Sequence, residues 1–169
     1  PLHGLDAIHV HHGLSPNADD WAQFCADYCT RLGIPLSIRR VLVDPSVGFG
    51  LEAAAREARY AAFAETARDC LLLAQHRGDQ AETVLFNLLR GAGVTGAAGM
   101  PAERAFGKLR LLRPLLDCSR AEIEAYAGQA GLSWVDDESN ADTSLTRNFL
   151  RHEALAALNQ RFPAAEASL

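Results

Sequence analysis

Five apolar residues in a row, Cys70 to Ala74, constrain the fold of this chain more than any other segment. A short continuous apolar run is typical of a strand that is buried on both faces, as strands of parallel sheets are. Strand patterns alternate with helical patterns along the first half of the chain, which predicts βα units and a parallel sheet with flanking helices. The expected elements are strands at residues 5–10, 35–43 and 70–74, helices at 17–32 (capped by Asn17 and stopped by Gly33), 51–69 and 79–90, and a loop at Gly48 to Gly50.

The pattern changes after Gly91. Ser119 followed by Glu122 is a capping-box pattern and predicts the start of a helix. The other expectations are a glycine-rich loop at 91–101, a strand at 109–112, an acidic loop at 134–142 and a helix at 145–158. We expect one α/β domain over residues 1–169, with the sheet and its helices in 1–116 and a helical part in 117–169.

The composition, 49% apolar and 22% charged residues in a chain of 169, is ordinary for a globular protein. No apolar run reaches the roughly 20 residues that a membrane span needs, so no membrane is expected as a partner. Four cysteines are too few for a disulfide scaffold and favour reduced thiols in the cytoplasm. A net charge of −5 does not exclude nucleic acid, because local patches can differ in sign.

The turn that follows Cys70–Ala74 carries His76, Asp79 and Glu82. Ligands of parallel α/β sheets bind beyond the carboxyl ends of the strands, where this turn lies. Asp79 and Glu82 are three residues apart and therefore share one face of the first helical turn. They are either acidic residues that meet the helix dipole, or ligands of Mg²⁺ with substrate phosphates, or a site for an ammonium group.

The segment Gly91 to Gly96 matches G-x-G-x-x-G letter for letter. The dinucleotide fingerprint must follow a strand and open a helix, whereas this segment follows a helix. We therefore interpret it as a helix stop and a loop.

Histidines 9, 11 and 12 lie at the end of the first strand. A zinc site is the less favoured reading, because no further ligand pair accompanies them. His12-Gly13 at a strand end is better suited to a nucleotide base or phosphate. Arg59 lies one turn from Arg56 on the second helix, where a solvated face is the competing reading.

Arg147-Asn148 and Arg151 place two guanidinium groups four residues apart on one helix face. That spacing suits phosphate contacts. The alternative is surface charge, paired with Asp142 or Glu138.

Eight motifs occur in order along nearly the whole chain: His12-Gly13-Leu14, Ala55 to Tyr60, Gln75 to Thr83, Leu89 to Gly93, Gly99-Met100-Pro101, Arg113 to Leu116, Asp137 to Asn140, and Arg147-Asn148 with Arg151. In these motifs the chain closely resembles the tRNA(Ile)-lysidine synthetases. That family belongs to the N-type ATP pyrophosphatases of the PP-loop superfamily, with an adenine-nucleotide α-hydrolase-like (Rossmann-like) fold.

The resemblance implies an ATP-dependent ligase with two steps. ATP adenylates the C2 oxygen of the wobble cytidine in tRNA(Ile) with a CAU anticodon, and pyrophosphate leaves. The side-chain amine of free L-lysine then attacks C2 and displaces AMP, which forms lysidine. Mg²⁺ and arginines would neutralise the phosphate charge, and the carboxylate pair would position the lysine cation.

The resemblance also implies roles for single residues. Those of the catalytic turn are His76, Asp79 and Glu82, the last two being candidate Mg²⁺ ligands as well. Those of the ATP pocket are His12, Gly13 and Arg59, and those that contact tRNA or phosphate are Arg113, Arg147, Asn148 and Arg151.

Two other function classes stay open. Another PP-loop ATP pyrophosphatase, such as a tRNA thiolation enzyme, would more typically show a Cys-x-x-Cys pair, which the Cys25/Cys29 spacing lacks. A non-catalytic nucleotide-binding module shares the βα plan but has no need of Asp79 and Glu82. The sequence leaves the oligomeric state open.

The family's phosphate-binding loop, SGGxDS, does not occur in these 169 residues. The chain is therefore expected to be an N-terminally truncated catalytic domain that lacks its first strand, which leaves an unpaired position in the sheet. We predict that this segment alone binds ATP weakly or not at all. Calorimetric titration would detect binding, and micromolar affinity would contradict the prediction.

Overall fold

A computed structural model describes residues 4–44 and 50–169 of the chain, so the loop expected at Gly48 lies outside the described residues. The chain divides into two compact units, Pro1–Arg68 and Asp69–Leu169. The predicted single domain, with its internal boundary at residue 116, stays a prediction.

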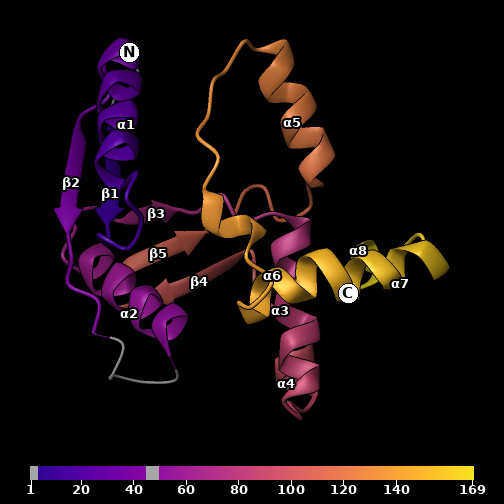
Figure 1. Ribbon diagram of the computed structural model, residues 1–169. Helices are drawn as coiled ribbons and strands as arrows, with labels where there is room; N and C mark the ends of the chain where they lie inside the picture. Colours follow the sequence, from indigo (N-terminus) through magenta and orange to yellow (C-terminus); the bar gives the residue numbers. More distant parts are fainter. Residues whose placement is uncertain (1–3, 45–49) are drawn as a thin grey trace. The chain divides into compact units, whose positions relative to one another are not determined.

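Unit 1 is a βαβ arrangement followed by a helix (Figure 1). Strand β1 (Ala7–His11) pairs in parallel with β2 (Leu36–Arg40), in a register that sets Ala7 opposite Leu36 and His11 opposite Arg40. Helix α1 (Ala18–Leu32) connects them, and α2 (Leu51–Ala64) follows. The predicted parallel pairing is confirmed, whereas α2 ends five residues before the predicted residue 69.

Helix α1 ends as the sequence predicts. Gly33 has a φ of 66°, and its N–H donates to the carbonyl of Thr30, while Ile34 N–H donates to Cys29 over 2.9 Å. Only glycine adopts this left-handed conformation without strain. Asn17 occupies the N-cap position as expected, but its side chain makes no capping hydrogen bond.

Unit 2 holds a three-stranded sheet in the order β3–β5–β4. Strand β5 pairs in parallel with β3 and antiparallel with β4, so it is the central strand (Figure 1). The elements are β3 (Cys70–Leu72), α3 (Arg77–Leu89), α4 (Val94–Ala97), β4 (Glu103–Phe106), β5 (Leu109–Leu112), α5 (Arg120–Gln129), the 3-10 turn η1 (Glu138–Ala141), α6 (Thr146–Phe149), the π-helical turn η2 (Leu150–Ala154), α7 (Leu155–Arg161) and α8 (Ala165–Ser168).

The burial expected of the Cys70–Ala74 strand is wrong. Cys70 and Leu72 are exposed, because β3 is an edge strand that pairs with β5 alone among the described residues. The central strand takes the buried position instead, with Leu109 and Leu111 almost fully enclosed. Strand β4 was not expected, since its sequence Glu103–Phe106 has no run of apolar residues.

The remaining expectations hold in part. Ser119 and Glu122 form the predicted capping box of α5, with Ser119 N–H donating to Glu122 over 2.7 Å. Helix α3 begins two residues earlier than predicted, and the loop at 91–101 contains the short helix α4. The helix expected at 145–158 is a succession of α6, η2 and α7. In residues 4–44 and 50–169, no helix is both long and apolar enough to span a bilayer.

Substituting Gly33→Ala is expected to lower the free energy of unfolding by about 1 kcal/mol, because a Cβ is strained at this φ. Gly128→Ala in α5 is the control, since that glycine has no positive φ and nothing within 4 Å of an added Cβ. The control should be neutral or gain up to about 1 kcal/mol. Urea unfolding followed by circular dichroism measures both, and an unchanged Gly33→Ala variant would contradict the expectation.

Candidate functional site

The predicted catalytic turn lies at the carboxyl ends of the parallel strands β3 and β5. Gln75 and His76 follow β3, and Arg113 follows β5 directly. The pairing continues one residue past β3, where Leu73 N–H donates to Leu112 over 2.9 Å. The topology therefore brings segments 38 residues apart in sequence to one edge of the sheet.

His76 and Asp79 cap helix α3 for each other. Gly78 N–H donates to His76 Nδ1 over 3.0 Å, and His76 N–H donates to Asp79 Oδ2 over 2.9 Å. An added Cβ on Gly78 would lie 2.8 Å from the His76 ring, so the turn leaves no room for a side chain there. Because Asp79 Oδ2 is used by the cap, Oδ1 is the oxygen that faces other partners.

Those partners are arginines of the α6–η2 helix. Arg151 Nε donates to Glu82 Oε1 over 2.5 Å, and its Nη2 lies 3.6 Å from Asp79 Oδ1. Arg147 Nη1 lies 4.0 Å from Glu82 Oε2. From the sequence, we expected these arginines either to contact phosphate or to pair with Asp142 or Glu138. The structure instead pairs them with the two carboxylates of α3. We call these four residues the carboxylate–arginine cluster.

Glu82 is the buried centre of the cluster. It is 1% exposed, and its Oε2 is enclosed without a hydrogen-bond donor. Burial raises the pKa of Glu82, and the hydrogen bond and charge of Arg151 only partly offset this. A buried carboxylate is compensated either by a cation or by a proton, because burial penalises its charged form.

Arg151 owes its position to an irregularity in its helix. It is the second residue of the π-helical turn η2, which separates α6 from α7 and packs beside α3. π-helical turns are rare in proteins overall, and those that occur are often found at functional sites. No residue type in Leu150–Ala154 signals the π-helical turn in advance, so only the folded chain reveals it.

Arg113 and Asn148 are buried rather than presented to a ligand. Arg113 is 4% exposed, and its guanidinium donates to Gln75 Oε1 over 2.5 Å and to Pro101 O over 2.6 Å. Asn148 Nδ2 donates to the carbonyls of Ser139 and Asp142. This geometry favours a role in holding neighbouring segments over the direct tRNA or phosphate contact that we expected.

Gln75, Gln80 and Met100 are part of the site although the sequence singled out none of them as functional. Gln80 Nε2 donates to Met100 O over 3.1 Å, and Met100 N–H donates to Gln80 Oε1 over 2.7 Å. Gln80 and Met100 each lie in a motif that carries the family resemblance, Gln75–Thr83 and Gly99–Pro101 respectively. The presence of these motifs is the only feature of the sequence that points to the two residues. Their pairing could not be derived from spacing.

In unit 1, the structure brings His12 and Arg59 together. Arg59 Nε donates to His12 Nε2 over 3.4 Å, and Gly13 follows with a φ of 68°. Burial, and then the charge of Arg59, lowers the pKa of His12, so the ring is a neutral acceptor. Its Nδ1 is enclosed without a hydrogen-bond partner. The expected nucleotide-binding residues are thus adjacent at the carboxyl end of β1.

Neither candidate metal site is arranged for a metal. His9 and His11 contact Cys25 and Asp19 respectively, and the described part of the chain holds no group of three or more His, Cys, Asp or Glu side chains that could bind a metal ion. At Asp79 and Glu82, arginines already compensate the charge. These carboxylates therefore do not fit a protein-built Mg²⁺ site.

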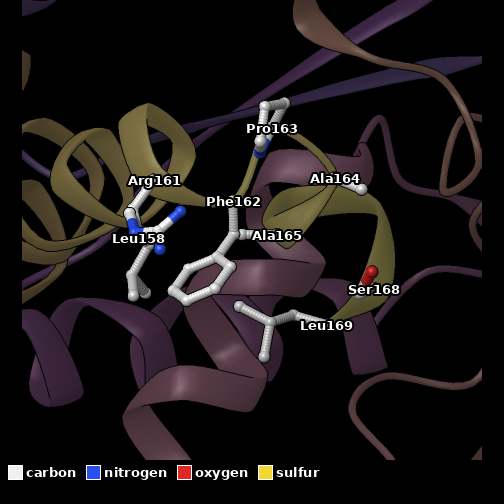
Figure 2. Close-up of a pocket in the computed structure, with 8 residues that line it drawn as sticks. All are labelled: Leu158, Arg161, Phe162, Pro163, Ala164, Ala165, Ser168 and Leu169. Carbon is white, nitrogen blue, oxygen red and sulfur yellow. The ribbon is translucent and has the colours of Figure 1, made fainter.

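A separate hollow of about 560 Å³ lies at the end of unit 2 (Figure 2). The side chains of Leu158, Phe162 and Leu169 gather on one side of it, and its lining is mainly apolar. None of its lining residues belongs to the carboxylate–arginine cluster, so the hollow does not bear on the chemistry above.

Comparisons with known proteins show the family of the chain. Residues 2–158 match the PP-loop domain family. The chain is 56% identical to the tRNA(Ile)-lysidine synthase of Pseudomonas fluorescens over 98% of its length, and 53% identical to that of Pseudomonas syringae over 99%. It spans only 37% and 38% of these two relatives.

The solved structure of the U34-tRNA thiolase NcsA from Methanococcus maripaludis, with its 4Fe-4S cluster, has a similar fold. The TM-score is 0.76 at 19% identity, and the match covers 97% of this chain and 58% of the thiolase. At this identity the likeness concerns the fold alone, and it confirms the predicted α/β class.

Substituting Glu82→Gln is expected to change how stability depends on pH. Because the folded pKa of Glu82 is raised above its ordinary 4.5, the protein loses stability as pH rises from about 4.5 through the raised value. Glu82→Gln removes this loss, so the variant should gain relative to the parent over that window. Unfolding free energies between pH 4 and 8 test this.

Glu122→Gln is the matched control with the opposite sign. Hydrogen bonds from Ser119 lower the pKa of Glu122, so its contribution is present above 4.5 and is lost as pH falls through the lowered value. The difference between parent and control should therefore change below pH 4.5 and stay flat above it. If the difference in unfolding free energy between the parent and Glu82→Gln stayed constant between pH 4 and 8, the assigned burial effect would be contradicted.

Proposed function

Because this chain belongs to the PP-loop domain family, as the match over residues 2–158 shows, we propose that it forms part of an ATP-dependent tRNA(Ile)-lysidine synthase. The enzyme would join free L-lysine to C2 of the wobble cytidine in tRNA(Ile) with a CAU anticodon. Relatives that are 56% and 53% identical carry this name, and they are longer than the chain.

The observation that carries the proposal is the carboxylate–arginine cluster. Glu82 and Asp79 form an anionic pair at the carboxyl end of a parallel strand, where ligands of α/β sheets bind. A lysine substrate brings an ammonium group, which two carboxylates bind in preference to neutral amines. The pair already holds a guanidinium group, which supports its capacity for a cation.

In the proposed reaction, the C2 oxygen of cytidine attacks the α-phosphorus of ATP, and pyrophosphate leaves. The lysine amine, after losing a proton, then attacks C2, and the C2–O bond breaks to release AMP. Asp79 and Glu82 would orient the lysine. Burial keeps the pKa of Glu82 above its usual range, which brings this carboxylate closer to accepting a proton from the ammonium group.

Positive charge near the transferred phosphates would come from Arg147 and Arg151, which are within reach of the same carboxylates. His12, Gly13 and Arg59 would line the nucleotide pocket, in keeping with the neutral, enclosed His12 ring. Mg²⁺ would enter bound to the phosphates of ATP and neutralise their charge. Asp79 and Glu82 are not arranged to hold it unaided, so we assign no step to it.

We propose the cytoplasm as the location of the enzyme, because its proposed substrates tRNA, ATP and free lysine meet there. A tRNA thiolation activity is the second candidate, and the similar fold of the U34-tRNA thiolase supports no more than a common scaffold at 19% identity. The more similar relatives favour lysidine formation.

Substituting Asp79→Ala in the intact protein is expected to abolish lysidine formation. Asp79→Asn keeps an oxygen that can accept the cap from His76 N–H but removes the charge, and it should lower the rate at least about 100-fold. Mass spectrometry of the tRNA anticodon after incubation with ATP and lysine measures the product. Glu124→Gln, at an exposed glutamate paired with Arg120, is the control and should keep parental activity. Parental turnover by Asp79→Asn would refute the assignment.

A further inference from the structure

The segment Gly99–Pro101 approaches the first turn of α3 unusually closely. Gly99 has a φ of 68°, and an added Cβ would lie 2.7 Å from Gln80 Nε2. The same Gln80 amide bonds to Met100 twice, as donor to its carbonyl and as acceptor from its N–H. A side chain that satisfies both backbone groups of one residue fixes distance and orientation together, as a strand partner would.

A second set of contacts joins the Gly99–Pro101 segment to the turn at the start of α3. Buried Arg113 joins Gln75 Oε1 to Pro101 O, and Gln75 Nε2 lies 3.2 Å from Met100 Sδ. Arg113 and Met100 are 4% and 9% exposed, so little water competes for these bonds. Both glutamines of the catalytic turn are therefore tied to the same three-residue segment.

Because of the position of Gln80 on α3, its hydrogen bonds to Met100 restrain the first turn of the helix. At about 100° per residue, Gln80 points about 160° away from Glu82 around the axis of α3. Arg151 holds Glu82 on one side of the helix, and Met100 holds Gln80 on the opposite side. Rotation or displacement of the first turn is thus opposed from both sides.

We propose that Gln80 is a positioning residue for the Asp79–Glu82 pair: through α3 it sets where the carboxylates meet the lysine substrate, without touching that substrate. The proposal rests on the proposed function. Reacting groups must be placed to well under 1 Å, and a shift of about 1 Å costs about 100-fold in rate. Losing the Met100 clamp should therefore affect lysine binding and turnover together.

The first test is Gln80→Met in the intact protein, which keeps the side-chain length and removes both hydrogen bonds. We expect kcat to fall at least about 10-fold and KM for lysine to rise at least about 5-fold, with KM for ATP within about 2-fold. A purely structural role would lower the active fraction and leave both KM values unchanged. Unchanged KM for lysine would therefore overturn the proposal. If Gln80→Met does not fold, Gln80→Glu, which keeps the acceptor for Met100 N–H, replaces it with the same readouts.

Gly99→Ala supplies an independent test with a matched control. Its Cβ would collide with the Gln80 amide, so the same rise in KM for lysine is expected. Gly107 has a similar positive φ of 59°, but a Cβ added there would have no atom within 4 Å. Gly107→Ala should therefore keep the parental KM values. Equal effects of the two variants on KM for lysine would show that backbone strain alone is at work, which would overturn the proposal.

A double-mutant cycle separates this inference from the proposed function. Gln80→Met and Arg151→Gln each change the unfolding equilibrium constant by some factor. If Gln80 and Arg151 hold the same helix turn, the factor measured for the double variant should differ from the product of the two single factors by at least about 3-fold. Multiplication within experimental error would overturn the inference whether or not lysidine forms. An intact parent that makes no lysidine would refute the proposed function, and the cycle would then decide the inference alone.

Discussion

The buried charge of Glu82 is the constraint on which the site depends. A carboxylate that is 1% exposed needs compensation, and Arg151 supplies it at 2.5 Å. The two residues are 69 positions apart, so this ion pair ties the helix after β3 to the helix that begins at Thr146. Removing Arg151 would leave the charge of Glu82 without its hydrogen-bonded partner in the interior, which typically costs about 3–5 kcal/mol.

Around this pair, polar side chains form hydrogen bonds with backbone groups at the ends of the helices and in the loops. His76 and Asp79 cap α3, Gln80 bonds to Met100, and Asn148 satisfies two carbonyls of the 139–142 segment. Each of these bonds joins a loop to an element that carries a member of the carboxylate–arginine cluster. The site therefore depends on side-chain contacts between loops and helices, and not on one helix alone.

The same contacts reassign roles among the arginines. Arg113 is enclosed and bonded to Gln75 and Pro101, a geometry that favours a role in holding these segments together, while its predicted contact with tRNA or phosphate stays a prediction. Arg151 and Arg147 instead face carboxylates. A cationic substrate would compete with these arginines for the carboxylates, and phosphates would compete with the carboxylates for the arginines. Arginines that look alike in sequence thus differ by what surrounds them, and burial is the property that separates them.

The sequence by itself determined the order of the elements from β1 to α3, the stop at Gly33, the capping box at Ser119 and the position of the turn that carries His76 and Asp79 after β3. Each depends on residues within a few positions of one another, so local spacing and backbone preference suffice. The resemblance of eight ordered motifs also pointed to the PP-loop family, which residues 2–158 then matched.

Only the tertiary structure decided that β3 is an exposed edge strand, that β4 exists, and that Arg151 pairs with Glu82 through a π-helical turn. These features depend on which segments meet across long sequence distances. A strand's burial is set by its neighbours in the sheet, and a charged side chain's role is set by the partner that compensates it. Local spacing carries no information about either.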